Sequence, residues 1–200
     1  MVIWKVSYHD FHPLALLGCG SQEENLFRRT SLAFSLADIE EWDSERSWYY
    51  PIDKTGGVYV PDVSVIRGSE LAGYPLLKRV HNLDVICVSA FRTPKLDHTG
   101  KKLHSSVVED VRKKIRLMFA IALQHQVTCL VLSAWGCGAY RNPPDHIAQL
   151  MKGVLNEYDG MFEQVVFAIY NDQNARTEGG NVLPFEKEFG MKAVPTEEVK

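Results

Sequence analysis

Residues 128–151 read TCLVLSAWGCGAYRNPPDHIAQLM and hold the clearest structural pattern in the chain. The first eight of these residues form a continuous apolar run of strand length, and a helix is predicted from Pro143 to about Tyr158. The glycine-containing segment between them predicts a tight connection from strand to helix. Asn142 is a good N-cap residue, and Pro143 suits the first position of a helix.

Two further apolar runs of strand length lie at 83–90 (LDVICVSA) and 164–170 (QVVFAIY). A helix from Ser105 or Ser106 to about Gln124 separates the first run from residues 128–135, because its apolar residues recur at spacings of three and four. Apolar strands that alternate with helices indicate a sheet covered on both faces. The predicted class is α/β, a three-layer α/β/α sandwich with a mixed, largely parallel central sheet.

The N-terminal part of the chain is less regular. Residues 2–7 alternate weakly and predict a first strand, and residues 21–36 predict one helix. The polar, aromatic stretch at 40–51 indicates a loop or lid. Residues 57–68 are β-branched but contain Pro61, which favours a broken pair of strands or an edge strand.

Composition places the chain among globular proteins, with 200 residues, 46% hydrophobic and 24% charged. One domain is expected over residues 1–172, followed by a polar tail over 173–200. The net charge of −3 and the absence of a long basic run give no reason to expect nucleic acid. The short basic run 112–114 is predicted to lie on a solvated helix face.

Cysteine use and hydropathy predict where the protein resides. Cys19, Cys87, Cys129 and Cys137 form no C-x-x-C pair, which favours reduced thiols. No apolar stretch approaches the roughly 20 residues that span a bilayer, and the N-terminus does not resemble a signal peptide. An intracellular, cytoplasmic protein without membrane contact is expected.

The WGCGAYRNPP segment, residues 135–144, has features of a phosphate-binding turn. Gly136 and Gly138 would let consecutive backbone N–H groups face a ligand, and the following helix would add partial positive charge. The alternative is a plain connection between strand and helix, and these residues alone do not decide between the two. Arg141 stands where a dinucleotide-binding fingerprint needs its third glycine.

A second glycine turn, Gly18 to Gly20, precedes Ser21-Gln22-Glu23-Glu24. Ser21 and Glu24 fit a capping box, a structural role in which the glutamate reaches back to the N-cap amide. Glu23 is not needed for that role, and the two glycine turns would form two sides of a ligand site if they share one edge of the sheet. Both interpretations remain open at this point.

Other candidate chemistry is weaker. His9, Asp10 and His12 lack a third ligand at a matching spacing, so no metal site is predicted. Cys137 lies in a glycine turn but has no evident partner for nucleophilic catalysis. His146 is expected to face solvent from the helix that follows.

Four blocks of sequence together resemble the bacterial-type poly(ADP-ribose) glycohydrolase family, a branch of the macrodomain fold. They are QEENLFRRTSL, VYVPDVSVIR, LVLSAWGCGAYRNPPDHIAQLM and VVFAIYND, in family order between residues 18 and 172. The combination of Q-E-E with W-G-C-G-A-Y is far more specific than either motif alone. The resemblance implies a macrodomain-like ADP-ribose-binding domain over residues 1–172.

The resemblance also implies roles for individual residues. Glu24 would be the general acid, Glu23 would hold the ribose next to the scissile bond, and Gln22 would support their loop. The turn that wraps the diphosphate would be formed by Gly136, Cys137, Gly138, Ala139 and Tyr140. Tyr140 would also pack on the bound ribose, and Tyr170 would lie beside the adenine.

The implied reaction is hydrolysis of the ribose–ribose O-glycosidic bond of poly(ADP-ribose), without metal or cofactor. A carboxylic acid protonates the leaving oxygen and then activates water as a carboxylate. Two adjacent glutamates repel each other, which favours one of them staying protonated. The expected partners are ADP-ribose or ADP-ribosylated proteins, and the expected state is a monomer.

The segment before Q-E-E departs from the family pattern in a way that bears on catalytic activity. The family has three consecutive glycines before Q-E-E, where this chain has His12-Pro13-Leu14. The chain also begins shortly before this loop, so the domain is expected to be N-terminally short. Side chains at these positions would crowd the ligand, and Pro13 removes a backbone donor. The alternative function is therefore a reader that binds ADP-ribose with little or no hydrolysis.

Overall fold

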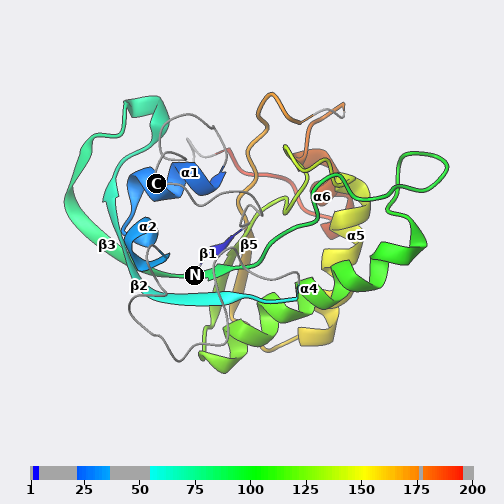
Figure 1. Ribbon diagram of the computed structural model, residues 1–200, viewed down its shortest axis with the longest axis horizontal. Coiled ribbons are helices and arrows are strands. Elements are labelled where there is room, and N and C mark those ends of the chain that lie inside the picture. The colour runs from blue at the N-terminus through cyan, green and yellow to red at the C-terminus, as the bar shows by residue number, and fades with distance from the viewer. Residues whose placement is uncertain (1, 5–21, 37–54, 176–177, 196–200) are drawn as a thin grey trace.

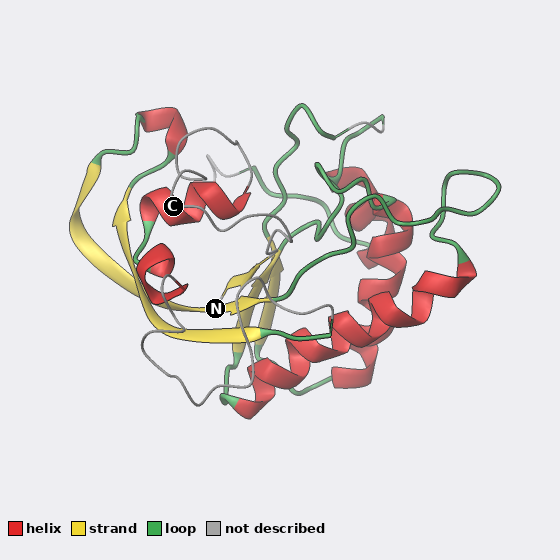
Figure 2. Ribbon diagram, viewed as in Figure 1, coloured by secondary structure: helices red, strands yellow, loops and turns green. Residues whose placement is uncertain are grey.

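The computed structural model describes residues 2–4, 22–36, 55–175 and 178–195. Their strands form one sheet in the order β2-β3-β1-β4-β5. The bounds are β1 Val2–Trp4, β2 Val58–Arg67, β3 Leu76–Cys87, β4 Cys129–Leu132 and β5 Gln164–Phe167. Only β2, among these strands, runs antiparallel to its neighbour. The mixed, largely parallel α/β sheet predicted from the sequence is confirmed (Figures 1 and 2).

Helices lie on both sides of this sheet. The bounds are α1 Gln22–Arg29, α2 Leu32–Leu36, α4 Ser105–Gln124, α5 Pro144–Leu155 and α6 Val182–Phe189, with short 3₁₀ turns η2 Glu70–Ala72 and η3 Asn156–Tyr158. Helices α4, α5 and α6 gather on one side, whereas α1 and α2 lie inside the curve of β2 and β3 (Figure 1). None of the helices in the described ranges combines the length and apolar character needed to cross a membrane.

The last residues of β3 and Val88, which directly follows the strand, contribute to the two hydrophobic clusters of the described chain. Val85 and Cys87 belong to the cluster that contains Phe27, Leu32 and Leu36 from α1 and α2. Ile86 and Val88, which point the other way, belong to the larger cluster of α4 and α5. Side chains alternate between the faces of a strand, so burial on both faces produces the three layers.

Helix α4 follows the predicted bounds and core positions. The buried side chains include the predicted Val111, Ile115, Met118, Phe119 and Ala122. Its N-cap is His104, whose side chain accepts a hydrogen bond from Ser106 N, rather than either serine. The imidazole nitrogen supplies the acceptor that a serine oxygen would otherwise provide.

The basic run on α4 is less exposed than predicted. Lys114 retains only 5% of its accessible surface. Its Nζ donates to the backbone oxygen and to Oγ of Ser89, at 3.0 and 3.1 Å. The prediction of a solvated face is therefore wrong at Lys114, because this residue lies on the buried stripe next to Ile115.

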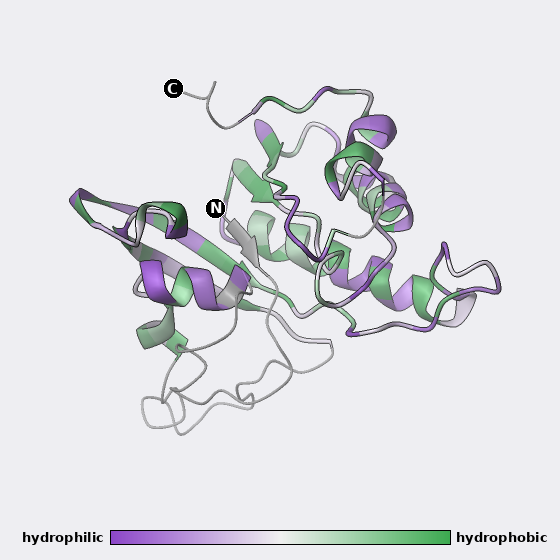
Figure 3. Ribbon diagram, turned by 90° about the horizontal axis from the view of Figure 1, so that it is seen from above, coloured by the Kyte–Doolittle hydropathy of each residue, from purple (hydrophilic) through white to green (hydrophobic). Residues whose placement is uncertain are grey.

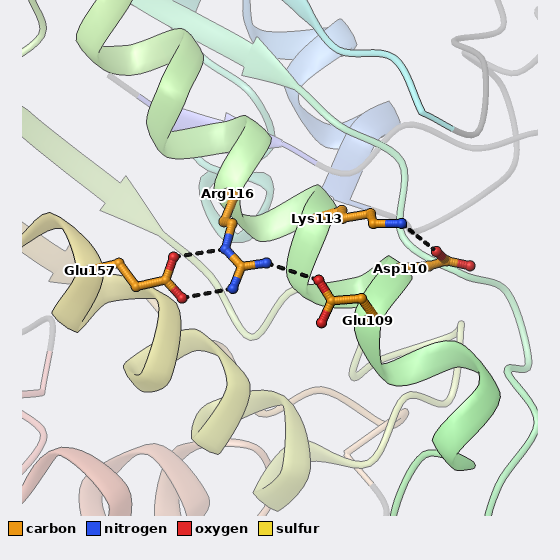
Figure 4. A network of polar contacts seen from close by, with 5 residues as sticks. All are labelled: Glu109, Asp110, Lys113, Arg116 and Glu157. Carbon is orange, nitrogen blue, oxygen red and sulfur yellow. Dashed lines mark hydrogen bonds and ion pairs between the residues drawn. The ribbon is translucent and has the colours of Figure 1, made fainter.

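An arginine joins α4 to the end of α5 (Figure 4). Arg116 donates from Nε and NH2 to the two carboxylate oxygens of Glu157 in η3, at 2.7 and 2.8 Å, and from NH1 to Glu109. A bidentate arginine–carboxylate pair holds both groups in one geometry. This contact ties η3, which directly follows α5, to α4.

The helix predicted over residues 21–36 is divided in two. Thr30 forms a bridge with Val65 of β2, and Ser31 exchanges hydrogen bonds with Ser64. These bonds to the edge strand replace helical ones and turn the chain between α1 and α2. Figure 3 shows the consequence, since α1 is largely hydrophilic and the following α2 is hydrophobic.

Strand β2 is a single edge strand that contains irregularities between Val60 and Val63 and between Val65 and Arg67. Asp62 has a left-handed backbone, with φ of 57°. Its N–H donates to Asp84 of β3 at 3.0 Å, and Asp84 also accepts from the Tyr59 hydroxyl at 2.8 Å. Bulges bend a strand, and here β2 and β3 curve around α1 and α2.

The other strands differ from the predicted lengths. β4 and β5 end at Leu132 and Phe167, earlier than the apolar runs in the sequence. β3 begins at Leu76, earlier than predicted. The apolar pattern did not reveal the first half of this strand, because most of its residues are exposed. Strand pairing, rather than hydrophobicity, defines that half.

Part of the predicted polar tail is a packed helix. Phe185 of α6 is buried, and its ring centre lies 5.2 Å from that of Phe167 in β5. Lys152 of α5 donates a hydrogen bond to the backbone oxygen of Glu188. In the sequence, polar residues separate α6 from the rest of the domain, which is why the prediction placed it in the tail. In the structure, its short apolar face packs against the core.

We expect Asp84→Ala to lower the free energy of unfolding by about 1–3 kcal/mol, because Asp62 N and the Tyr59 hydroxyl lose their acceptor. Urea denaturation measures this change. Asp110→Ala is the control, since Asp110 forms only an exposed pair with Lys113 at 3.6 Å. An equal loss in both variants would contradict the role assigned to Asp84.

The Asp84 contribution should also depend on pH. The bond from Asp62 N, and then that from Tyr59, lower the pKa of Asp84 below its ordinary value. Its stabilisation is therefore complete above about pH 4 and is lost as the pH falls through the lower folded pKa. The difference between wild type and Asp84→Ala should shrink over that range.

Candidate functional site

The WGCGAYRNPP turn and Tyr170 lie on segments that leave one edge of the sheet, whereas Gln22, Glu23 and Glu24 lie on α1. Strands β3, β1, β4 and β5 are parallel, so their carboxyl ends meet at the same edge. Residues 88–93 follow β3, residues 133–143 follow β4, and residues 168–175 follow β5. Such an edge is where open α/β sheets bind ligands.

The turn after β4 is tied to the segment after β3. Trp135 Nε1 donates to Val88 O at 3.1 Å, and Thr93 N donates to Tyr140 O at 2.9 Å. The side-chain amide of Asn142 donates to Phe91 O and to Gly136 O, at 2.8 and 2.9 Å. These bonds hold the backbone of the turn in one shape before any ligand arrives.

Asn142 does not cap α5 as the sequence predicted. The N-cap is Pro143 and the helix begins at Pro144, while Asn142 is almost fully buried behind the turn. Two prolines at the start of α5 remove N–H groups that a helix N-terminus normally offers. Any anion at this place must therefore take its backbone donors from the turn itself.

The two glycines of the turn have different roles. Gly136 has φ of 77°, and a Cβ there would lie 2.7 Å from Asn142 Nδ2 and 2.9 Å from Ala90 Cβ. A Cβ on Gly138 would meet nothing nearer than Asn174 Cβ, at 3.9 Å. Gly136 is thus required by the fold, whereas Gly138 borders open space.

The backbone next to that space has free donors. Within the described part of the chain, the N–H groups of Gly138 and Ala139 donate to no acceptor. Ala139 is exposed and Gly138 is half-buried. Successive unpaired N–H groups in a rigid turn form a concave site that suits an anion such as a diphosphate.

The side chains of Cys137 and Tyr140 point into the core rather than toward solvent. Both belong to the larger hydrophobic cluster, and Cys137 Sγ lies 3.7 Å from Trp135 O. Burial of the thiol does not favour the nucleophile considered for Cys137. The contact of Tyr140 with a bound ribose stays a prediction.

Helix α1 carries the predicted catalytic residues. Gln22 is exposed at its first position, and Glu24 is half-buried. Glu24 Oε2 is buried and accepts no hydrogen bond from the described residues. A buried carboxylate oxygen without a donor is uncommon in proteins and suits a site completed by a polar ligand.

Several predicted positions lie outside the described residues. These are Ser21, the Gly18–Gly20 turn, His9, Asp10 and the His12–Leu14 segment, and the structure likewise does not describe the side chain of Glu23. The choice between a capping box and a ligand role for Ser21 to Glu24 therefore stays open. The described residues include no cluster of potential metal ligands.

The segment after β5 contributes a residue that the sequence analysis missed. Asn174 is the nearest neighbour of the open side of Gly138, and Asp172 fixes it through bonds to Asn174 N and Nδ2 at 2.8 and 2.9 Å. An aspartate two residues before an asparagine after a strand is a turn signal that could have drawn attention to it. Tyr170 is 75% exposed in the same segment, and its contact with adenine stays a prediction.

His146 does not face solvent as predicted. Its Nδ1 accepts a hydrogen bond from Leu103 N at 2.9 Å. Burial lowers the pKa of His146, and nearby Lys102 and Arg112 lower it further. The hydrogen bond from Leu103 N to His146 thereby anchors the end of the loop that begins at Phe91.

No family model and no curated protein sequence matches the chain, but solved structures do. The poly(ADP-ribose) glycohydrolase of Deinococcus radiodurans in complex with ADP-ribose matches with a TM-score of 0.72 and 24% identity, over 94% of this chain and 74% of that one. The enzyme from Thermomonospora curvata, bound to the inhibitor ADP-HPD, matches with a TM-score of 0.75 and 23% identity, over 94% and 69%. The chain has the fold of the bacterial poly(ADP-ribose) glycohydrolases.

Proposed function

We propose that the protein binds ADP-ribose and hydrolyses the ribose–ribose O-glycosidic bond of poly(ADP-ribose). The observation that supports this proposal is the turn at Gly138, where the N–H groups of Gly138 and Ala139 have no acceptor among the described residues and a Cβ on Gly138 would border open space. The diphosphate would accept hydrogen bonds from Gly138 and Ala139. The shared fold supports the choice of ligand, since the similar proteins were solved with ADP-ribose or ADP-HPD.

Glu24 is the proposed general acid. The bond between the anomeric carbon and the leaving ribose oxygen breaks as the Glu24 carboxyl gives its proton to that oxygen. Water then adds to the carbon, and the Glu24 carboxylate takes up the proton that the water releases. The orphaned Oε2 is consistent with a carboxyl group whose partner is supplied by the ligand.

A second candidate is a reader that binds ADP-ribose, free or attached to proteins, without turnover. The observation that favours it is His12-Pro13-Leu14 at the place where the resembled family has three glycines. Both candidates need the Gly138 turn, so binding alone does not separate them. Turnover of poly(ADP-ribose) does.

Gly138→Glu tests the turn. The added carboxylate enters the open space and repels a diphosphate, while the fold tolerates a side chain there because no atom lies closer than 3.9 Å. We expect calorimetric titration to show at least a tenfold weaker affinity for ADP-ribose, about 1.4 kcal/mol, with an unchanged melting temperature. Met161→Glu is the control, since it adds the same charge at an exposed site before β5. Unchanged affinity in folded Gly138→Glu would overturn the binding proposal.

Glu24→Gln tests the catalytic step. Glutamine keeps the shape and can still serve in a capping box, but it cannot transfer a proton. We expect turnover to disappear while ADP-ribose affinity stays within about threefold, or about 0.65 kcal/mol. If Glu24 only caps α1, Glu24→Gln retains the wild-type rate, and Ser21→Ala costs about 0.5–2 kcal/mol of stability.

Replacement of His12, Pro13 and Leu14 by glycine separates enzyme from reader. Glycines would let the backbone approach the ligand, so we expect faster hydrolysis if Glu24 is correctly placed. Release of ADP-ribose from poly(ADP-ribose) measures the change. Absence of turnover in both wild type and the glycine variant, with ADP-ribose still bound, would support the reader.

A further inference from the structure

The tip of the β2–β3 hairpin contacts α1 through polar side chains. Asn25 Nδ2 donates to Glu70 Oε2 at 3.0 Å, and Arg28 NH1 donates to the Tyr74 hydroxyl at 3.1 Å. The Arg28 guanidinium carbon also lies 5.9 Å from the centre of the Tyr74 ring. We call Glu70 and Tyr74 together with these two partners on α1 the clasp.

Helix α1 needs such contacts. It is short and largely hydrophilic, and Phe27 is its one side chain buried in the core among those described. An isolated helix of this length is unstable in water, so tertiary contacts determine whether it forms and where it lies. The apolar contact of Phe27 secures one face, and the clasp secures another.

The clasp contacts are aligned with the candidate catalytic residue. Arg28 follows Glu24 by four residues, so both side chains lie on the same face of α1, one turn apart. Asn25 and Arg29 form the adjacent row, where Arg29 Nε donates to Arg67 O at 3.4 Å. A shift of the hairpin tip would therefore move the face that carries Glu24.

The tip has a costly backbone conformation that presents Tyr74. Gly73 and Tyr74 are both left-handed, with φ of 76° and 57°. Such a conformation is unfavourable for a tyrosine, and it persists only where surrounding bonds impose it. Tyr74 N donates to Ser69 O at 3.0 Å, and Arg67 NH1 donates to Tyr74 O at 3.3 Å.

The bulge at Asp62 brings the tip to α1. β2 and β3 curve around α1 and α2, and the tip of their hairpin lies beside α1 (Figures 1 and 2). The left-handed Asp62, held by Asp84, lies where the pairing of these strands is irregular. A straight hairpin would carry residues 70–74 away from α1.

We infer that the clasp positions α1 for catalysis, with Asn25 and Tyr74 as positioning residues that act through Glu24. This inference rests on the proposed function for the role of Glu24. In this interpretation, the exposed first half of β3, which contributes little to the hydrophobic core, serves to carry the hairpin tip to α1.

A polarity swap at Asn25 and Glu70 tests the inference. Asn25→Asp sets two carboxylates against each other, whereas Asn25→Asp with Glu70→Gln restores one donor and one acceptor in reverse order. Because a 1 Å misplacement can cost about 100-fold in rate, we expect Asn25→Asp to lower kcat by about tenfold or more at unchanged KM. The double variant should recover most of kcat. Non-specific destabilisation would not be repaired by the second substitution.

Tyr74→Ala provides an independent variant, and Leu71→Ala is its control on the same tip, since Leu71 is 91% exposed. Tyr74→Ala should lower kcat and accelerate hydrogen exchange at the amides of residues 26–29, whereas Leu71→Ala should change neither. Tyr74→Phe, which keeps the ring but loses the hydroxyl, should fall between them.

The outcomes separate the clasp from the proposed function. Turnover that is equal in wild type, Asn25→Asp and Tyr74→Ala overturns the clasp and leaves the hydrolase intact. A wild type without turnover contradicts the proposed hydrolase. In that case, hydrogen exchange at the amides of α1 tests whether the clasp positions this helix. Exchange that rises in Asn25→Asp and falls back in the double variant supports the clasp, and unchanged exchange overturns it.

Discussion

Burial of both faces of β3 is the constraint on which the described structure depends. Val85 and Cys87 fill one hydrophobic cluster, while Ile86 and Val88 fill the other, and all four are fully buried. The strand also pairs with β1 on one side and β2 on the other. Its two ends lead to the two parts of the site, the hairpin that contacts α1 and the segment that holds the turn after β4.

The shape of the turn after β4 depends largely on one polar side chain, that of Asn142. Asn142 bonds to the segment after β3 and to the turn itself and is almost fully buried, whereas Ala139 in the same turn is exposed. The conformational entropy of such a turn is lost during folding, so ligand binding need not order it again. The proline pair at the start of α5 is compatible with this arrangement, because the helix terminus is not needed as a donor.

Hydrophobic spacing predicted the parts of the fold where burial decides structure. It identified α4 through residues such as Val111, Ile115 and Met118, and it identified the core of β3, β4 and β5. It also placed the glycine turn after β4, where the structure has it. These features are local in sequence, so a local pattern reveals them.

Long-range polar contacts could not be predicted in this way. Burial of Lys114 depends on the hydrogen bond that its Nζ donates to Ser89 O, and His146 accepts a hydrogen bond from Leu103 N. In each case the partner lies far away in the sequence. Asn142 carries the residue type of an N-cap, but its bonds are with Phe91 and Gly136. The clasp depends on a bend in β2 and β3 that brings together residues about 45 positions apart, as between Asn25 and Glu70. Side-chain type suggested roles for these residues, and only the folded chain shows which partner each one meets.

The bulge in β2 has a consequence for association between molecules. An edge strand with a regular row of unpaired N–H and C=O groups can act as a template for a strand from another chain. In β2, Pro61 lacks an N–H, Asp62 turns its backbone out of register, and Thr30 occupies part of the edge at Val65. The same residues that bend the hairpin around α1 therefore interrupt the edge along which amyloid-like stacking or domain swapping would begin.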